Sequence, residues 1–158
     1  RIPVDFRRTD DRETDGDVRL RVLHPPPPDW ERRRVRHGDS VVLEVTYRDV
    51  AVLLTGDISA EVEREILPRL TRAPVRILKV AHHGSRTSSS PELLSEWRPQ
   101  FALISAGRGN TFGHPTPEVL QRLSAIGATV FRTDLHGQIT VETDGRQVTA
   151  TTFRSEQR

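Results

Sequence analysis

Residues 75–85 read VRILKVAHHGS, and this stretch decides how the rest of the chain is interpreted. Its run of apolar and β-branched residues predicts a buried strand that ends at His82. Two adjacent imidazoles at a strand end are uncommon in a core, and neutral imidazole nitrogens bind zinc or manganese well. Adjacent side chains on an extended chain point in opposite directions. We therefore expect only one of His82 and His83 to bind a metal ion directly.

Strand and helix patterns alternate on both sides of this stretch. Ser59 and Ser90 precede two predicted helices as candidate caps, and Pro91 suits the first position of the second helix. We expect an α/β sandwich domain at residues 18–153, after a polar leader at 1–17 and before a tail at 154–158. Strands are predicted at residues 18–23, 40–47, 50–55, 75–81, 101–105, 129–132, 138–142 and 148–153, and helices at residues 60–70, 91–97 and 117–126.

The composition limits the chemistry that the chain can perform. The 158 residues are 34% hydrophobic and 29% charged, which is typical of one soluble globular domain. The absence of cysteine excludes thiolate metal sites and cysteine nucleophiles. Net charge is only +2, and Lys79 is the only lysine among the basic residues. Arginine suits phosphate contacts, but a codon bias explains its abundance equally well, so composition is weak evidence for nucleic acid binding.

Two further loops that follow predicted strands carry reactive side chains. Residues 53–57 (LLTGD) deliver the carboxylate of Asp57 to a strand tip, where it could bridge two metal ions or only cap the next helix. Residues 109–115 (GNTFGHP) present the amide of Asn110 and the imidazole of His114, which could also be ordinary loop side chains. Because sites in α/β folds assemble at strand ends, we expect the three loops to share a cleft. His136 lies in a turn-like segment and is interpreted as structural.

Six segments resemble the C-terminal metallo-β-lactamase-like domain of ComEC-type DNA internalisation proteins. The resemblance runs from about residue 18 to residue 153, and the His-His-Gly-Ser and Gly-His-Pro elements are its most specific parts. The segments are residues 39–43 (DSVVL), 53–57 (LLTGD), 78–85 (LKVAHHGS), 88–90 (SSS), 110–115 (NTFGHP) and 131–134 (FRTD).

The resemblance implies an αββα sandwich, in which each half of the sequence supplies one sheet. It also implies a phosphodiester-cleaving site that holds zinc or manganese, with two ions in the intact domain. Asp57 matches the bridging carboxylate of that superfamily, and either His82 or His83 matches its last metal-binding histidine. His114 matches a family element whose role the resemblance does not define.

The chain departs from the family in one respect. The family carries an upstream His-x-His-x-Asp-His-like motif that supplies most of the metal ligands, and no such string occurs here. We therefore expect this chain, which also contains no methionine, to be the downstream half of such a domain. Its expected partners are the upstream half-domain and the membrane channel region of the same polypeptide, on the extracytoplasmic side of a bacterial inner membrane.

The leading functional hypothesis is metal-dependent hydrolysis of DNA, with single-stranded DNA as partner, during uptake of transforming DNA. One alternative is a non-catalytic module that guides single-stranded DNA or packs against a channel. Another is a small-molecule phosphodiesterase of the same fold. The candidate catalytic residues are His82, His83, His114 and Ser85, the candidate metal ligands are Asp57, His82 and His83, and the candidate phosphate-binding or DNA-binding residues are Ser85, Arg86, Thr87, Asn110 and Arg132.

Overall fold

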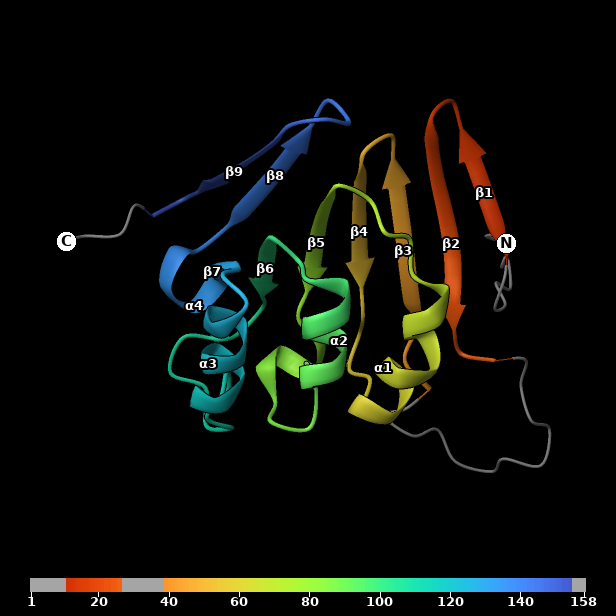
Figure 1. Cartoon of the computed structure of the whole chain (residues 1–158). Coiled ribbons are helices and arrows are strands. Elements are labelled where there is room, and N and C mark those ends of the chain that lie inside the picture. Colours follow the sequence, from red (N-terminus) through yellow and green to blue (C-terminus); the bar gives the residue numbers. More distant parts are fainter. Residues whose placement is uncertain (1–10, 27–38, 155–158) are drawn as a thin grey trace, which may run out of the picture.

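The computed structural model describes residues 11–26 and 39–154, which form a seven-stranded sheet and a separate two-stranded hairpin (Figure 1). The α/β class expected from the sequence is confirmed. The strands are β1 (Arg12–Asp15), β2 (Val18–His24), β3 (Val42–Tyr47), β4 (Val50–Leu54), β5 (Val75–Lys79), β6 (Phe101–Ile104), β7 (Thr129–Arg132), β8 (Ile139–Thr143) and β9 (Val148–Thr152).

The large sheet keeps the order of the sequence from β1 to β7. Strands β1 to β4 pair antiparallel, whereas β4 to β7 pair parallel. Parallel neighbours need crossover connections, which here contain helices, and these crossovers bring the carboxyl ends of four strands to the same sheet edge. The helical segments are α1 (Ala60–Ile66), η2 (Leu67–Arg69), η3 (Ala81–Gly84), α2 (Pro91–Trp97), α3 (Pro117–Ala125) and α4 (Thr133–His136).

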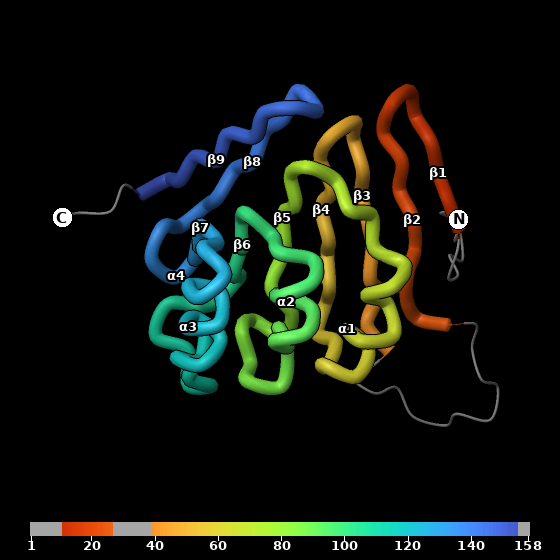
Figure 2. Tube along the Cα trace, viewed as in Figure 1, coloured from red at the N-terminus to blue at the C-terminus, as the bar shows by residue number. Residues whose placement is uncertain are grey.

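Helices α1, α2 and α3 cover one face of the sheet (Figures 1 and 2). Their apolar residues pack against alternate residues of the central strands, and the removal of this surface from water drives the packing. The core residues supplied by the helices are Val62, Ile66, Leu93, Leu94, Trp97, Val119 and Leu123, and those supplied by the strands are Leu23, Val42, Ala51, Leu53, Leu78, Ala102 and Ile104.

A side-chain cap explains where α2 begins, and a proline explains where α1 ends. The hydroxyl of Ser90 accepts a hydrogen bond from the Leu93 N–H at 3.2 Å, and Pro91 occupies the first turn, as predicted. Ser59 is the residue before α1, but its side chain makes no capping hydrogen bond. The helix predicted for residues 60–70 is α-helical only to Ile66 and continues as η2. Pro68 lies in this tighter turn, where its missing N–H removes an α-helical hydrogen bond.

Two local predictions are wrong. Residues 12–15, predicted as part of a polar loop, form the edge strand β1, because they pair with residues 18–21 around a turn at Gly16. The segment around His136, predicted as a turn, is the short helix α4. Residues 31–37 (ERRRVRH), whose composition predicts a basic connector, lie outside the described residues. Within the described ranges, no helix is long and apolar enough to cross a membrane.

A buried carboxylate on α1 fixes the segment that follows the histidine pair. Glu63 is fully buried and accepts hydrogen bonds from the backbone N–H groups of Ser89 at 2.6 Å and Ser90 at 2.7 Å. The hydroxyl of Ser88 lies 2.9 Å from the carbonyl oxygens of both Ala81 and Ser85. The serine triplet at residues 88–90 therefore connects helix α1 to the histidine-bearing turn η3.

We predict that Glu63→Gln destabilises the domain by about 2 kcal/mol, because the amide would turn an N–H group toward a backbone donor and leave it unsatisfied. Urea unfolding followed by circular dichroism measures this loss. Glu61→Gln, at an exposed position of the same helix, is the matched control and should change stability by less than about 0.5 kcal/mol. Equal losses in the two variants would contradict the structural role of Glu63.

Candidate functional site

The parallel register places the three predicted loops at one edge of the sheet. Asp57 follows β4, the histidine pair follows β5, and His114 lies in the loop after β6. Backbone hydrogen bonds join these loops: His82 N–H donates to the Gly56 carbonyl at 3.1 Å, and Thr116 N–H donates to the Gly84 carbonyl at 2.9 Å. The strand order therefore brings the three loops together, as the sequence predicted.

Asp57 is held by the turn that ends β4. Gly56 adopts φ +55, and a Cβ atom there would lie 2.9 Å from the Cβ of Ser40, so both the conformation and the space favour glycine. The Asp57 N–H donates to the Ser40 hydroxyl at 3.2 Å. Nearby, burial lowers the pKa of Lys79, and the charge of Asp57 partly opposes this shift. The carboxylate of Asp57 stays 36% exposed and is accessible from solvent.

His82 and His83 do not lie on an extended chain. Strand β5 ends at Lys79, and the two histidines adopt left-handed backbone conformations with φ 48 and φ 55 inside η3. The extended backbone predicted for them, from which opposite side-chain directions were expected, is therefore wrong. Two consecutive non-glycine residues in this region are strained, and such strain is concentrated at functional sites.

The orientation of His83 is set by one hydrogen bond. Its Nδ1 lies 2.7 Å from the carbonyl oxygen of Ser105, at the end of β6. Because a carbonyl oxygen only accepts, Nδ1 carries the proton, and in the neutral imidazole Nε2 then keeps its lone pair. That Nε2 lies 3.8 Å from the Oδ1 atom of Asp57, and the His83 side chain is 48% exposed. The pair combines a fixed imidazole donor atom with a carboxylate oxygen.

Two more imidazole contacts extend this pair. The ring centroids of His82 and His83 are 6.5 Å apart, and those of His82 and His114 are 5.8 Å apart in an edge-to-face arrangement. The Nδ1 atom of His114 is buried and has no hydrogen-bond partner within the described part of the chain. The histidine cluster therefore comprises His82, His83 and His114, with Asp57 beside His83.

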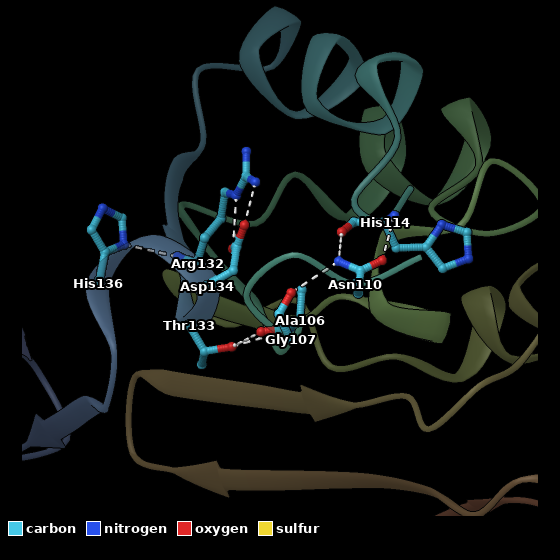
Figure 3. A network of polar contacts seen from close by, with 8 residues as sticks. All are labelled: Ala106, Gly107, Asn110, His114, Arg132, Thr133, Asp134 and His136. Atoms are coloured by element: carbon cyan, nitrogen blue, oxygen red, sulfur yellow. Dashed lines mark hydrogen bonds and ion pairs between the residues drawn. The ribbon is translucent and has the colours of Figure 1, made fainter. Parts of the chain in front are cut away.

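Asn110 shapes the loop that carries His114 (Figure 3). Its side-chain oxygen accepts from the His114 N–H at 3.1 Å, while its amide donates to the carbonyl oxygens of His114 at 2.7 Å and Gly107 at 3.0 Å. A phosphate contact would require some of these bonds to open. The structure gives Asn110 a positioning role in this loop, and phosphate binding by its amide stays a prediction.

Arg132 ends β7 and pairs with Asp134 (Figure 3). Its Nε and a terminal nitrogen donate to the two carboxylate oxygens at 3.1 and 2.5 Å, and this guanidinium lowers the pKa of Asp134. The backbone N–H of Arg132 donates to Nδ1 of His136, which is buried as a structural residue, as predicted. The Arg132 guanidinium is thus paired with a carboxylate of α4, and DNA binding by Arg132 stays a prediction.

One basic side chain is exposed in the segment that follows the histidines, residues 85–87. Ser85 is buried, and its hydroxyl lies 3.0 Å from that of Thr87. Arg86, between them, is exposed. The two hydroxyls are engaged with each other, whereas the Arg86 side chain is exposed to solvent, two residues after the turn η3. The phosphate contacts predicted for these residues are most direct at Arg86.

The residues that position the cluster were missed by sequence reasoning. Glu63 and Ser40 accept hydrogen bonds from backbone N–H groups beside the site. Thr133 joins the ends of β6 and β7, because its hydroxyl bonds to the N–H and the carbonyl of Ala106 at 2.8 and 2.9 Å (Figure 3). One signal was present, because Glu63 lies three residues before Ile66 on the apolar face of its helix. A charged residue at that spacing indicates a buried partner.

The cluster is incomplete as a metal centre within the described residues, where no group of three or more histidine, aspartate or glutamate side chains is arranged around one point. A cavity of about 450 Å³ is present, but it lies over β1, β2 and β3. The edge shared by the three loops is therefore confirmed, whereas the shared cleft predicted there stays a prediction.

Comparisons with known proteins identify homologues of this domain. None of the established family models matches the chain. Over 123 residues, or 78% of the chain, it is 36% identical to "ComE operon protein 3" of Bacillus subtilis. It is 36% identical over 69% of its length to "Competence protein ComA" of Neisseria gonorrhoeae. It is also 40% identical over 68% of its length to "Recombination protein 2" of Haemophilus influenzae.

Fold and site together define an α/β domain with a histidine and carboxylate cluster at the ends of parallel strands. The chain belongs to the ComEC-type competence proteins, as the sequence motifs predicted. It spans only 14 to 16% of the length of these relatives. The names of two of these relatives refer to competence and to recombination.

We predict that Gly84→Ala disrupts the contact between the histidine turn and the His114 loop. Gly84 has φ +85, and a Cβ atom there would lie 2.6 Å from the Cβ of Pro115. Gly113→Ala is the matched control, because Gly113 has φ +69 but no atom within 4 Å. Left-handed strain should cost each variant about 1 kcal/mol, and the clash should cost Gly84→Ala about 1 to 3 kcal/mol more. Thermal unfolding measures both, and equal losses would contradict the close approach.

We predict that Asp134 contributes stability that acid removes. Arg132 holds its folded-state pKa below the unfolded value, so the contribution is full above about pH 4 and is lost as the pH falls through the lower folded pKa. Asp134→Asn should reduce the free energy of unfolding at pH 6 by about 1 to 2 kcal/mol, and its difference from wild type should shrink below pH 4. Denaturant unfolding across this pH range tests this prediction, with the exposed Asp49→Asn variant as the control. A stability difference between Asp134→Asn and wild type that stays constant with pH would refute the pairing.

Proposed function

We propose that this chain forms part of a metal-dependent phosphodiester hydrolase that cleaves DNA during uptake of transforming DNA. The observation that carries the proposal is the pairing of Asp57 with His83. The Nδ1–H of His83 is fixed by the Ser105 carbonyl. The Nε2 atom of His83 lies 3.8 Å from the carboxylate of Asp57, and the two residues follow neighbouring parallel strands. Homology to competence proteins supports DNA as the substrate class.

The two side chains fit a divalent metal ion. A ligating histidine commonly donates its other ring N–H to a carbonyl or carboxylate, as His83 does to Ser105. Two ligands of one tetrahedral ion lie about 3.4 Å apart, close to the 3.8 Å between the His83 Nε2 and the Asp57 Oδ1. Zinc or manganese held there would acidify a water nucleophile and neutralise phosphoryl charge.

The remaining ligands in this proposal come from the upstream half-domain of the same polypeptide. Support comes from the sheet face opposite the helices, where the cross-strand pairs Leu43–Leu54 and Val45–Val52 are only partly covered. Leu54 is 38% exposed and Val18 is 39% exposed. A second sheet packed on this apolar face would complete the αββα sandwich and bring further ligands to the edge that carries Asp57.

The other members of the cluster supply positioning and charge in this proposal. His82 and His114 lie edge to face, and either imidazole can donate a proton to the leaving oxygen of a phosphodiester. Arg86 is exposed three residues after His83 in the sequence and can stabilise the charged phosphoryl oxygens. Ser85 and Thr87 keep the turn that carries Arg86 in shape through their hydroxyl contact.

In the proposed setting, the domain lies on the extracytoplasmic side of a bacterial inner membrane, beside the membrane channel region of its own polypeptide. Single-stranded DNA is the expected partner. A module that only guides DNA or packs against the channel would keep the same surroundings but would not need Asp57. The two roles therefore differ at that residue.

Cleavage of fluorescently labelled single-stranded DNA with manganese or zinc tests the proposal. The chain is compared with a version extended N-terminally to include the upstream histidine and aspartate motif. We expect little cleavage by the chain alone and metal-dependent cleavage by the extended protein. Asp57→Asn should reduce the extended protein's activity at least about 100-fold, because it removes a charged ligand.

Asp49→Asn, in the exposed turn between β3 and β4, is the matched control and should retain activity. An inert extended protein, or full activity after Asp57→Asn, would exclude the hydrolase role. Robust metal-dependent cleavage by the chain alone would instead exclude the need for upstream ligands. Phosphocholine esters assayed in parallel distinguish DNA cleavage from a small-molecule phosphodiesterase.

A further inference from the structure

The cavity of about 450 Å³ lies away from the histidine cluster, over the first three strands of the sheet. We call it the arginine groove and define it by the residues that line it. It occupies the helix-bearing face, because Glu44 pairs with the core residue Leu53 in the β3–β4 register. The lining residues are Arg12, Thr14, Gly16, Asp17, Arg19, Leu20, Arg21, Glu44, Thr46, Arg48 and Thr71.

Strand register produces the arginine groove. In the β1–β2 pair, Arg12 lies opposite Arg21 and Thr14 lies opposite Arg19. In the β2–β3 pair, Arg21 lies opposite Glu44 and Arg19 lies opposite Thr46. Directly paired residues share a face of the sheet, so arginine and threonine side chains form two rows across three strands.

The charges of the groove do not cancel. Its lining contains four arginines and two carboxylates, which leaves an excess of two positive charges. Glu44 is almost fully buried and bonds to Arg21 at 2.7 Å, and Asp17 bonds to Arg48 at 2.9 Å. Arg12 and Arg19 are exposed, and neither groove carboxylate bonds to them.

The buried side of the groove is rigid. Glu44 also accepts hydrogen bonds from the N–H of Thr71 at 2.6 Å and from its hydroxyl at 2.9 Å. The Nε of Arg21 is buried and has no hydrogen-bond partner within the described residues. A fixed floor, hydroxyl groups and two exposed guanidinium groups are the features that bind a phosphate ester oxygen.

We infer that the arginine groove binds the phosphate backbone of single-stranded DNA, as a contact separate from the histidine cluster. This inference rests on the proposed function for the identity of the polymer. The volume is in the range of about 300 to 1,000 Å³ that suits a small ligand or one nucleotide. Because no aromatic side chain lines the groove, it contacts backbone phosphates and does not stack bases.

The groove lies close enough to the histidine cluster for one DNA strand to contact both. Strand β1 lies three strand spacings, or about 14 Å, from β4, and the two rows of the groove lie level with Leu53 and Ala51, about 13 to 20 Å along the strand direction from Asp57. A DNA strand of a few nucleotides would reach from one to the other. Binding energy from the groove would then hold the strand while a distant phosphodiester lies at the histidine cluster.

Fluorescence anisotropy of a labelled 20-nucleotide single strand tests the inference. The full chain carries Asp57→Asn and the buffer contains EDTA, so that binding is measured without cleavage. We expect Arg12→Ala with Arg19→Ala to weaken binding about tenfold or more and to flatten the dependence of log affinity on log salt by about 1.4, which is the loss of two phosphate contacts.

Two further double variants separate charge from folding. Arg98→Ala with Arg154→Ala removes the same charge from exposed positions outside the groove and should change affinity less than about twofold. Arg12→Lys with Arg19→Lys keeps the charge and should bind within about threefold of the parent protein. Equal losses in the groove pair and the outside pair, or no loss in the groove pair, would overturn the inference.

The outcomes also distinguish this inference from the proposed function. Groove-dependent DNA binding without any metal-dependent cleavage would keep the groove and remove the hydrolase. DNA cleavage that is insensitive to the groove variants would keep the hydrolase and remove the groove as a DNA contact. Vesicles containing phosphatidylglycerol provide the last comparison: if the groove pair loses vesicle binding while DNA binding is unchanged, the groove is a membrane contact and the inference is wrong.

Discussion

The parallel register of β4, β5, β6 and β7 is the constraint on which the candidate site depends. Parallel strands end at the same edge of a sheet, so the segments that follow them meet whatever their separation in sequence. Asp57, His83 and His114 come from three different strand ends. The backbone hydrogen bonds from His82 to Gly56 and from Thr116 to Gly84 then fix the loops against one another.

Two buried glutamates connect the helices to this edge and to the arginine groove. Glu63 holds the serine segment that follows the histidines, and Glu44 holds Thr71, which follows η2. Each carboxylate is almost fully buried and receives hydrogen bonds that offset the cost of removing a charge from water. Glu63 receives two from backbone N–H groups, and Glu44 receives one from a backbone N–H, one from a hydroxyl and one from Arg21. A buried glutamate therefore fixes both the sheet edge that we propose for catalysis and the arginine groove that we propose for DNA binding.

Much of the fold could be predicted from local patterns. Strand β5 and the helix capped by Ser90 follow from apolar periodicity and capping chemistry. The helix spans the predicted residues, and the strand begins at Val75 as predicted but ends at Lys79, two residues earlier than predicted. The polar segment at residues 12–15 carries no such pattern, because β1 is an edge strand with fully exposed side chains. The left-handed backbone of His82 and His83 could not be predicted either, since neither residue is glycine and the turn is fixed by contacts with distant loops.

The sequence by itself determined which residue types reach the strand ends and which family the chain resembles, because motifs and periodicity are local properties. Only the tertiary structure decided which side chains meet. It paired Arg132 with Asp134, engaged Asn110 within its own loop, and turned His83 toward Asp57 through the carbonyl of Ser105. It also gathered arginines from separate strands into one groove. Those outcomes depend on strand register and on burial, which arise only when distant segments pack together.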